Sequence, residues 1–92
     1  MNKILVIDDD KSICESLSLY LSEEGFTVGV AYTAQDGLKQ SQTQDWEIII
    51  LDILLSDADG LDVLKEIKER SPHAGVIMNH AALQPSQMIA AL

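Results

Sequence analysis

The stretch Ile4-Leu5-Val6-Ile7-Asp8-Asp9-Asp10 decides the fold class. Its four consecutive apolar residues, three of them β-branched, predict a short strand buried on both faces, as is typical of parallel sheets. Apolar residues then recur at helical spacing over residues 11–24, with an N-cap supplied either by Asp10 or by Ser12 with Glu15 three residues later. A strand followed directly by a helix is the first half of a βαβ unit.

The same alternation continues along the chain. Further strands are predicted over residues 27–31, 46–51 and 75–78, and further helices over residues 33–41 and 61–70. Residues 81–92 carry only a weak helical pattern that Pro85 interrupts. Alternating strands and helices with short links predict a single α/β domain with a mostly parallel sheet.

The charge balance argues against several classes of function. The 92 residues include 6 Lys and Arg against 15 Asp and Glu, a formal net charge of −9, which disfavours direct contact with nucleic acid or an anionic membrane. Apolar runs such as 48–51 and 53–55 are far shorter than the ~20 residues of a membrane span, and the first residues do not have the pattern of a signal peptide. The single cysteine, Cys14, permits no internal disulfide, so we expect a reducing, cytoplasmic location.

Three aspartates directly follow or end strongly apolar strands. Asp8 and Asp9 come after the first strand, and Asp52 comes after the strand over residues 46–51. In open α/β sheets this carboxyl edge carries the ligand site, and neighbouring strands lie about 4.8 Å apart, so the three side chains are expected in one cleft. Crowded carboxylates repel unless a cation intervenes, and oxygen ligands suit Mg²⁺. For Asp10 and Asp62 the simpler interpretation is that acids gather at helix N-termini.

The acidic residues 57–60 also fit two other patterns in part. Read as an EF-hand loop, Asp57 and Asp59 would be the ligands at positions 3 and 5 and Glu66 the ligand at position 12, but position 1 would be Leu55, which offers no side-chain oxygen. The Asp-x-Asp pair also has the form of a haloacid-dehalogenase-like phosphatase nucleophile motif. Leu61 stands where such enzymes usually have Thr or Val, which argues against that interpretation.

Several segments together resemble the receiver domains of bacterial two-component response regulators. These are residues 4–10, the run 48–55 with Gly60 eight residues after Asp52, and residues 61–68 and 76–78, so that the resemblance covers roughly residues 3–82. It implies a flavodoxin-like, doubly wound parallel sheet with strand order 2-1-3-4. It also implies a phosphoacceptor module that controls an attached or downstream transcription-regulating output, rather than a classical enzyme.

The resemblance assigns roles to individual residues. Asp52 would accept a phosphoryl group from a sensor histidine kinase. Asp8, Asp9, Asp52 and the backbone carbonyl of Leu54 would hold Mg²⁺. His80 occupies the position where the family usually has a Thr or Ser that hydrogen-bonds the phosphoryl group.

The sequence departs from the family at three places. Ser56 stands where a Pro is usual, His80 replaces the hydroxyl residue, and no fifth strand with its lysine, or fifth helix, is predicted. We therefore expect residues 1–92 to form a receiver domain that is incomplete at its C-terminal end. These departures keep a second hypothesis open, in which the chain is a degenerate, non-phosphorylated receiver that acts as an interaction or dimerisation module.

An uncovered apolar stripe is the expected consequence of a missing fifth helix. Ile13, Leu17 and Leu21 lie on one face of the first predicted helix. Exposed apolar patches favour association, so a homodimer or a domain-swapped assembly is predicted.

Overall fold

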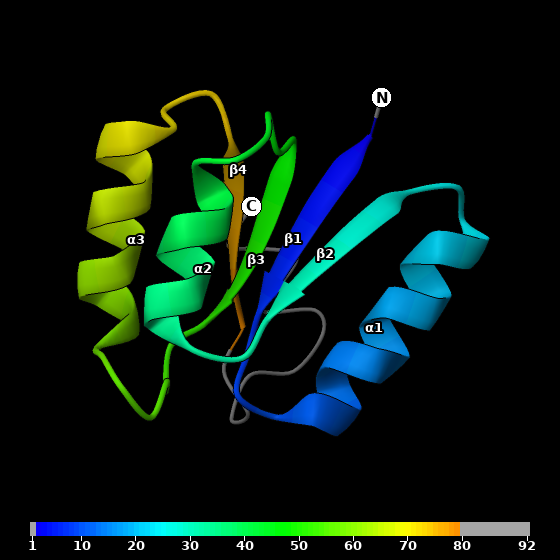
Figure 1. The fold of residues 1–92 in the computed structure, drawn as a ribbon, viewed down its shortest axis with the longest axis horizontal. Helices are drawn as coiled ribbons and strands as arrows, with labels where there is room; N and C mark the ends of the chain where they lie inside the picture. The colour runs from blue at the N-terminus through cyan, green and yellow to red at the C-terminus, as the bar shows by residue number, and fades with distance from the viewer. Residues whose placement is uncertain (1, 80–92) are drawn as a thin grey trace.

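The computed structural model describes residues 2–79 of the chain. Strands and helices alternate throughout this part (Figure 1). In chain order the elements are β1 (Lys3–Ile7), α1 (Lys11–Glu23), β2 (Thr27–Ala31), α2 (Ala34–Ser41), β3 (Ile48–Asp52), α3 (Gly60–Arg70) and β4 (Gly75–Asn79). The weak helical pattern over residues 81–92 falls outside the described residues.

The strands form one parallel sheet in the order β2-β1-β3-β4. Helix α1 packs on one face of this sheet, whereas α2 and α3 lie side by side on the other (Figure 1). The predicted doubly wound α/β architecture and strand order 2-1-3-4 are thus confirmed within residues 2–79.

The burial of β1 on both faces explains its continuous apolar sequence. Leu5 and Ile7 belong to the larger core cluster under α2 and α3, while Ile4 and Val6 pack with Cys14 of α1 on the opposite face. Successive side chains of a strand point to opposite faces, so a strand covered on both sides needs apolar residues at every position. The thiol of Cys14 is fully buried, in line with a small core residue.

The third strand begins later than the sequence predicts. Trp46 was expected inside it, but β3 starts at Ile48 and extends to Asp52. The indole of Trp46 is buried instead at the C-terminal end of α2, where its Nε1 donates a hydrogen bond to the carbonyl of Gln40 at 2.9 Å. A Cβ on Gly29 of β2 would lie 2.5 Å from this ring, so glycine there makes room for the indole.

Local capping closes the helices as the sequence indicates. The Asp10 side chain caps α1 and accepts from the backbone N–H groups of Ser12 and Ile13, so Asp10, and not Ser12 with Glu15, is the N-cap. Gly25 follows the end of α1 with φ +95°, a conformation that glycine adopts without steric cost.

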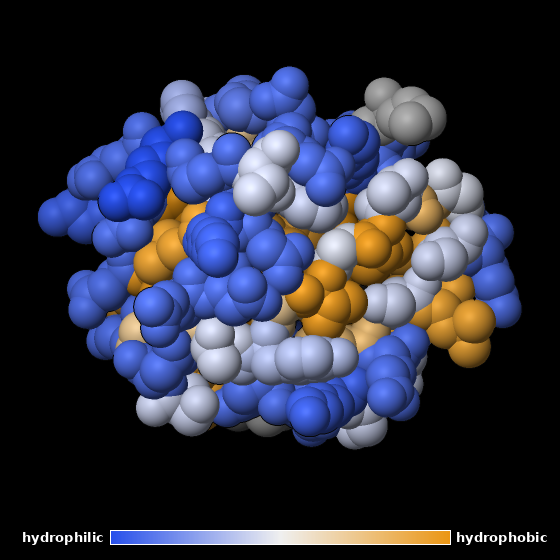
Figure 2. All heavy atoms as spheres, viewed as in Figure 1, coloured by the Kyte–Doolittle hydropathy of each residue, from blue (hydrophilic) through white to orange (hydrophobic). Residues whose placement is uncertain are grey.

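The stripe on α1 is only partly exposed. Leu17 and Leu21 pack against the core cluster beneath α1, and Ile13 remains 36% exposed. Apolar side chains also reach the surface between α1 and α2 (Figure 2). Assembly through this face remains a prediction. Within residues 2–79, none of the helices has the length and hydropathy that a membrane span requires.

Candidate functional site

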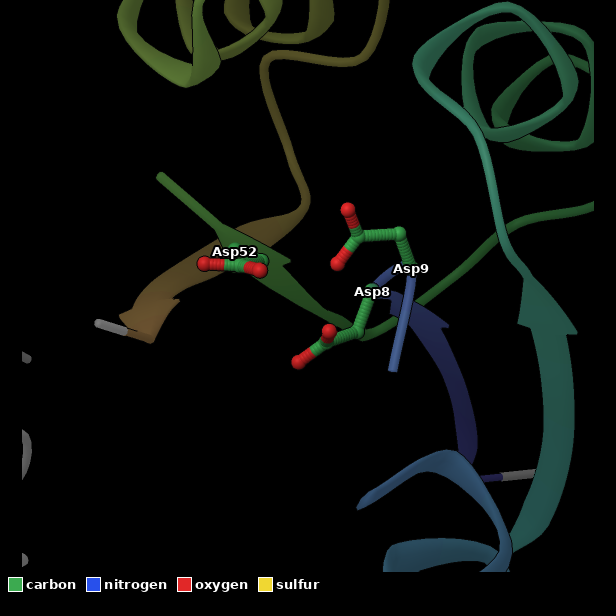
Figure 3. Close-up of side chains that lie close together, drawn as sticks. All are labelled: Asp8, Asp9 and Asp52. Atoms are coloured by element: carbon green, nitrogen blue, oxygen red, sulfur yellow. The ribbon is translucent and has the colours of Figure 1, made fainter. Parts of the chain in front are cut away.

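Three carboxylates meet at the carboxyl edge of the sheet. Ile7 of β1 pairs with Leu51 of β3, so the residues that follow them, Asp8 and Asp52, lie at the same level of adjacent strands. The side chain of Asp9 turns toward Asp52 from the adjoining position (Figure 3). The predicted cluster of Asp8, Asp9 and Asp52 therefore forms because two central strands run parallel and end together.

The spacing of these carboxylates fits a small divalent cation. One oxygen from each of Asp8, Asp9 and Asp52 lies within 4.8 Å of the other two. Around an octahedral Mg²⁺ ion with bonds of about 2.1 Å, adjacent ligand oxygens stand about 3.0 Å apart and opposite ones about 4.2 Å, so the carboxylates would bind by moving closer together or through bridging waters. The donor set, made only of carboxylate oxygens, suits Mg²⁺ as well.

The Asp8 carboxyl is held firmly in place. It is only 2% exposed, its Oδ1 accepts the backbone N–H of Asp10 at 2.9 Å, and its Oδ2 accepts from Asn79 Nδ2 at 3.3 Å. Burial above all, and then the charges of Asp52 and Asp9, raise the pKa of Asp8 from 3.8 to about 6, although the hydrogen bond from Asp10 opposes the rise. Without a cation, Asp8 therefore binds a proton more readily than an ordinary aspartate does.

A hollow opens beside the three carboxylates, and we call it the acidic hollow. It is lined by Asp8, Asp9, Asp10, Ile13, Asp52, Leu54 and Asn79. The backbone N–H of Leu54 donates to Asp52 Oδ1 at 3.1 Å, while the Leu54 side chain is 61% exposed. Leu54 thus lines the hollow and contacts Asp52 through its backbone N–H. The predicted role of its carbonyl as a metal ligand remains a prediction, and His80 lies outside the described residues.

The loop after Asp52 closes tightly on Gly60. The Gly60 N–H donates to the carbonyl of Ile53 at 3.0 Å, and a Cβ on Gly60 would lie 2.5 Å from the Ile53 backbone. Leu54 and Asp59 also form an antiparallel bridge within the loop. The eight-residue spacing between Asp52 and Gly60 is therefore the length of a closed loop that starts helix α3.

Two contributors to this edge were not predicted. Asp57 accepts the backbone N–H groups of Ala34 at 2.8 Å and Gln35 at 3.2 Å, so it caps α2 from a different loop. These bonds, that from Ala34 above all, lower the pKa of Asp57. Asn79 reaches Asp8 from a residue 71 positions along the chain. Neither contact follows a local sequence pattern; the only available signal for Asn79 was its position at the end of a predicted strand.

The chain matches the family described as response regulator receiver domain over residues 4–92. It belongs to this family. Among curated proteins, the receiver is 34% identical over 82 residues to the transcriptional regulatory protein DltR of Streptococcus agalactiae, which covers 89% of the chain. The chain spans only 37% of the length of that regulator.

Solved structures agree with this membership. A response regulator receiver domain protein from Methanospirillum hungatei superposes with a TM-score of 0.87 at 28% sequence identity. The match covers 97% of this chain and 71% of the Methanospirillum chain. The response regulator TrrA of Thermotoga maritima, in complex with Mg²⁺ and BeF, superposes with a TM-score of 0.82 at 34% sequence identity. This match covers 88% of the chain and 70% of the TrrA chain. A chain in the complex of TrrA with the histidine kinase ThkA superposes with a TM-score of 0.79 at 32% sequence identity. This match covers 95% of the present chain and 78% of the matched chain.

Proposed function

We propose that this receiver domain accepts a phosphoryl group on Asp52 from the phosphohistidine of a sensor histidine kinase. Mg²⁺ would be held by Asp8, Asp9, Asp52 and the backbone carbonyl of Leu54. The observation that carries the proposal is the convergence of three carboxylates from two adjacent strands within 4.8 Å. The relative TrrA, which has been solved with Mg²⁺ and BeF and with a histidine kinase, supports the same assignment.

The proposed transfer is a displacement at phosphorus. A carboxylate oxygen of Asp52 forms the new P–O bond while the P–N bond to the histidine ring breaks, and the ring nitrogen keeps the electron pair. Asp52 Oδ1 already accepts the N–H of Leu54, so Oδ2 is the oxygen that we assign to the attack. When bound, Mg²⁺ supplies positive charge that offsets the negative charge of the phosphoryl oxygens.

The wider setting belongs to the same proposal. The acyl phosphate adds about −1.5 to −2 charges to the edge of the sheet, and it would control an attached or downstream transcription-regulating output, as the similarity to DltR suggests. His80 would donate a hydrogen bond to the phosphoryl group. The domain would serve as a signalling module rather than a classical enzyme, in the cytoplasm, with a homodimer as a further expected state and without direct nucleic-acid contact.

Chemical phosphorylation tests this proposal without requiring the kinase. The chain is incubated with acetyl phosphate and Mg²⁺, and intact-mass spectrometry measures the adduct. We expect one phosphoryl group on the native chain and none on Asp52→Asn, whereas Asp57→Asn, a matched change in the loop that follows Asp52, should still be labelled. Equal labelling of Asp52→Asn would contradict the proposal.

Magnesium titration separates this function from that of a degenerate interaction module. A phosphoacceptor needs a cation site that depends on Asp9, whereas a degenerate module does not. Calorimetry on the native chain and on Asp9→Asn measures this dependence. If no adduct forms and Mg²⁺ binding does not depend on Asp9, the degenerate module becomes the better account.

A further inference from the structure

The side chain of Asn79 is tied to the acidic hollow from the neighbouring strand. Asn79 ends β4 and pairs in register with Asp52 of β3, and its carbonyl accepts the Ile53 N–H at 3.0 Å. With its backbone fixed in this way, its Nδ2 reaches across the strand end and donates to Asp8 Oδ2 at 3.3 Å. Asp8, Asp52 and Asn79 thus form a row across the ends of three adjacent strands.

The chemistry of Asn79 differs from that of every other residue lining the acidic hollow. The other six lining residues are four aspartates, Ile13 and Leu54, so Asn79 alone among the seven carries side-chain N–H groups. Because Asp8 Oδ1 already accepts the N–H of Asp10, the bond from Asn79 gives the second oxygen its partner. Two bonds from different directions fix the plane of the carboxylate and still leave each oxygen a lone pair.

We propose that Asn79 is a positioning residue for the divalent-cation site and acts by orienting the Asp8 carboxylate. This rests on the proposed function, because the cation is the Mg²⁺ that phosphoryl transfer requires. A neutral amide suits the role: a lysine would place a competing positive charge beside the cation, and an apolar side chain would leave a buried carboxylate oxygen without its donor.

Replacing the amide by an apolar group of similar size tests the role directly. Asn79→Leu should weaken Mg²⁺ binding by about 10-fold, the lower end of the effect of losing a residue that orients a metal ligand, because the bond is long. Met78→Leu, a volume-conserving change on the preceding residue of the same strand, is the matched control and should leave affinity unchanged. Calorimetric titration with MgCl₂ gives the dissociation constants.

The route through Asp8 is tested by combining substitutions. If Asn79 acts by orienting Asp8, then Asn79→Leu should change affinity by less than about 2-fold when Asp8 is already Asn, since coupled residues do not add. Thermal unfolding of each variant without Mg²⁺ separates a general loss of stability from a loss of the site. An undiminished 10-fold effect in the Asp8→Asn background would overturn the proposed route.

A spectroscopic measurement on the native chain guards against a variant that does not fold. The ¹⁵N side-chain amide resonances of Asn79 should shift saturably with Mg²⁺ and report the same dissociation constant as calorimetry. The inference would be overturned by unshifted resonances, or by a dissociation constant that Asn79→Leu leaves unchanged. If the chain still takes a phosphoryl group in that case, the proposed function stands. Weaker Mg²⁺ binding by Asn79→Leu in a chain that forms no adduct would support the inference and defeat the proposed function.

Discussion

The aspartates at the carboxyl edge of the sheet form two sets that differ in what their carboxylates face. Asp8, Asp9 and Asp52, the facing aspartates, present oxygens to one another within 4.8 Å. The capping aspartates, Asp10, Asp57 and Asp59, instead accept backbone N–H groups at the starts of α1, α2 and α3 respectively.

The difference shows that position at an edge does not by itself make an aspartate a ligand. The hydrogen bond from the Ser12 hydroxyl above all, and then those from backbone N–H groups of α1, lower the pKa of Asp10. Backbone N–H groups at the start of α2 lower the pKa of Asp57. The facing aspartates lie near like charges, and the pKa of buried Asp8 is raised to about 6. A cation is therefore expected to bind where carboxylates face one another.

The largest expected effect comes from Gly60, which closes the loop that follows Asp52 and carries Asp57 and Asp59. Gly60→Ala places a Cβ against the backbone of Ile53 and should destabilise the fold by about 3 kcal/mol, the upper range for overpacking a tight site. It should also weaken Mg²⁺ binding by displacing Asp52. Chemical denaturation measures the first effect. Gly75→Ala is the control, because its Cβ would meet no atom nearer than 3.6 Å; an equal loss there would contradict the explanation.

Removing one negative charge from the facing aspartates should weaken Mg²⁺ binding, whereas removing one from the capping aspartates should not. Asp9→Asn should weaken Mg²⁺ binding at least about 10-fold, because it removes a carboxylate that faces the cation. Asp10→Asn removes the same charge from the adjacent residue, yet Asn is also a good N-cap, so stability and affinity should change little. Calorimetry measures both variants, and similar losses of affinity would mean that only total charge matters.

A capping aspartate should contribute to stability and not to the cation site. Asp57→Ala removes the acceptor for two N–H groups of α2 and should lower the melting temperature by about 5 °C, as expected for a lost cap in a domain of this size. Calorimetric Mg²⁺ affinity should stay within about 2-fold, since screening by salt weakens exposed charges. Glu69→Ala, an exposed acid of α3, serves as the control for lost charge and should not lower the melting temperature.

The two sets should also differ in the sign of their pH dependence. Because the pKa of Asp8 rises from 3.8 to about 6 on folding, the folded state holds its proton more tightly, and this contribution to stability falls as pH rises through that interval without Mg²⁺. For Asp57, whose pKa is lowered, stability is instead lost as pH falls below its unfolded value.

Unfolding curves across pH 3–8 in the absence of divalent ions measure both signs. Asp8→Asn should remove a decline of less than about 1.4 kcal/mol per pH unit, the limit for one proton. Asp57→Asn should reduce only the loss of unfolding free energy at the acidic end of the pH range. A decline between pH 4 and 6 that persists in Asp8→Asn would assign it to another group.

Local patterns in the sequence were sufficient for the elements and for the facing aspartates. The apolar run of β1 predicted a strand covered on both faces, and Asp8, Asp9 and Asp52 were predicted to converge because each follows or ends such a strand. Trp46 was wrongly placed inside β3, because the β-propensity of its neighbours does not reveal the space that Gly29 provides on β2.

By itself, the sequence determined the order of strands and helices and the edge at which the acids gather, since these depend on periodicity and on neighbours a few residues apart. The tertiary structure was required for the contacts at this edge that join residues far apart in the chain. It alone brought Asp57 to α2, 23 residues away, and Asn79 to Asp8, 71 residues away. Such pairs depend on how parallel strands align and on how loops close between them, and no run of adjacent residues carries that information.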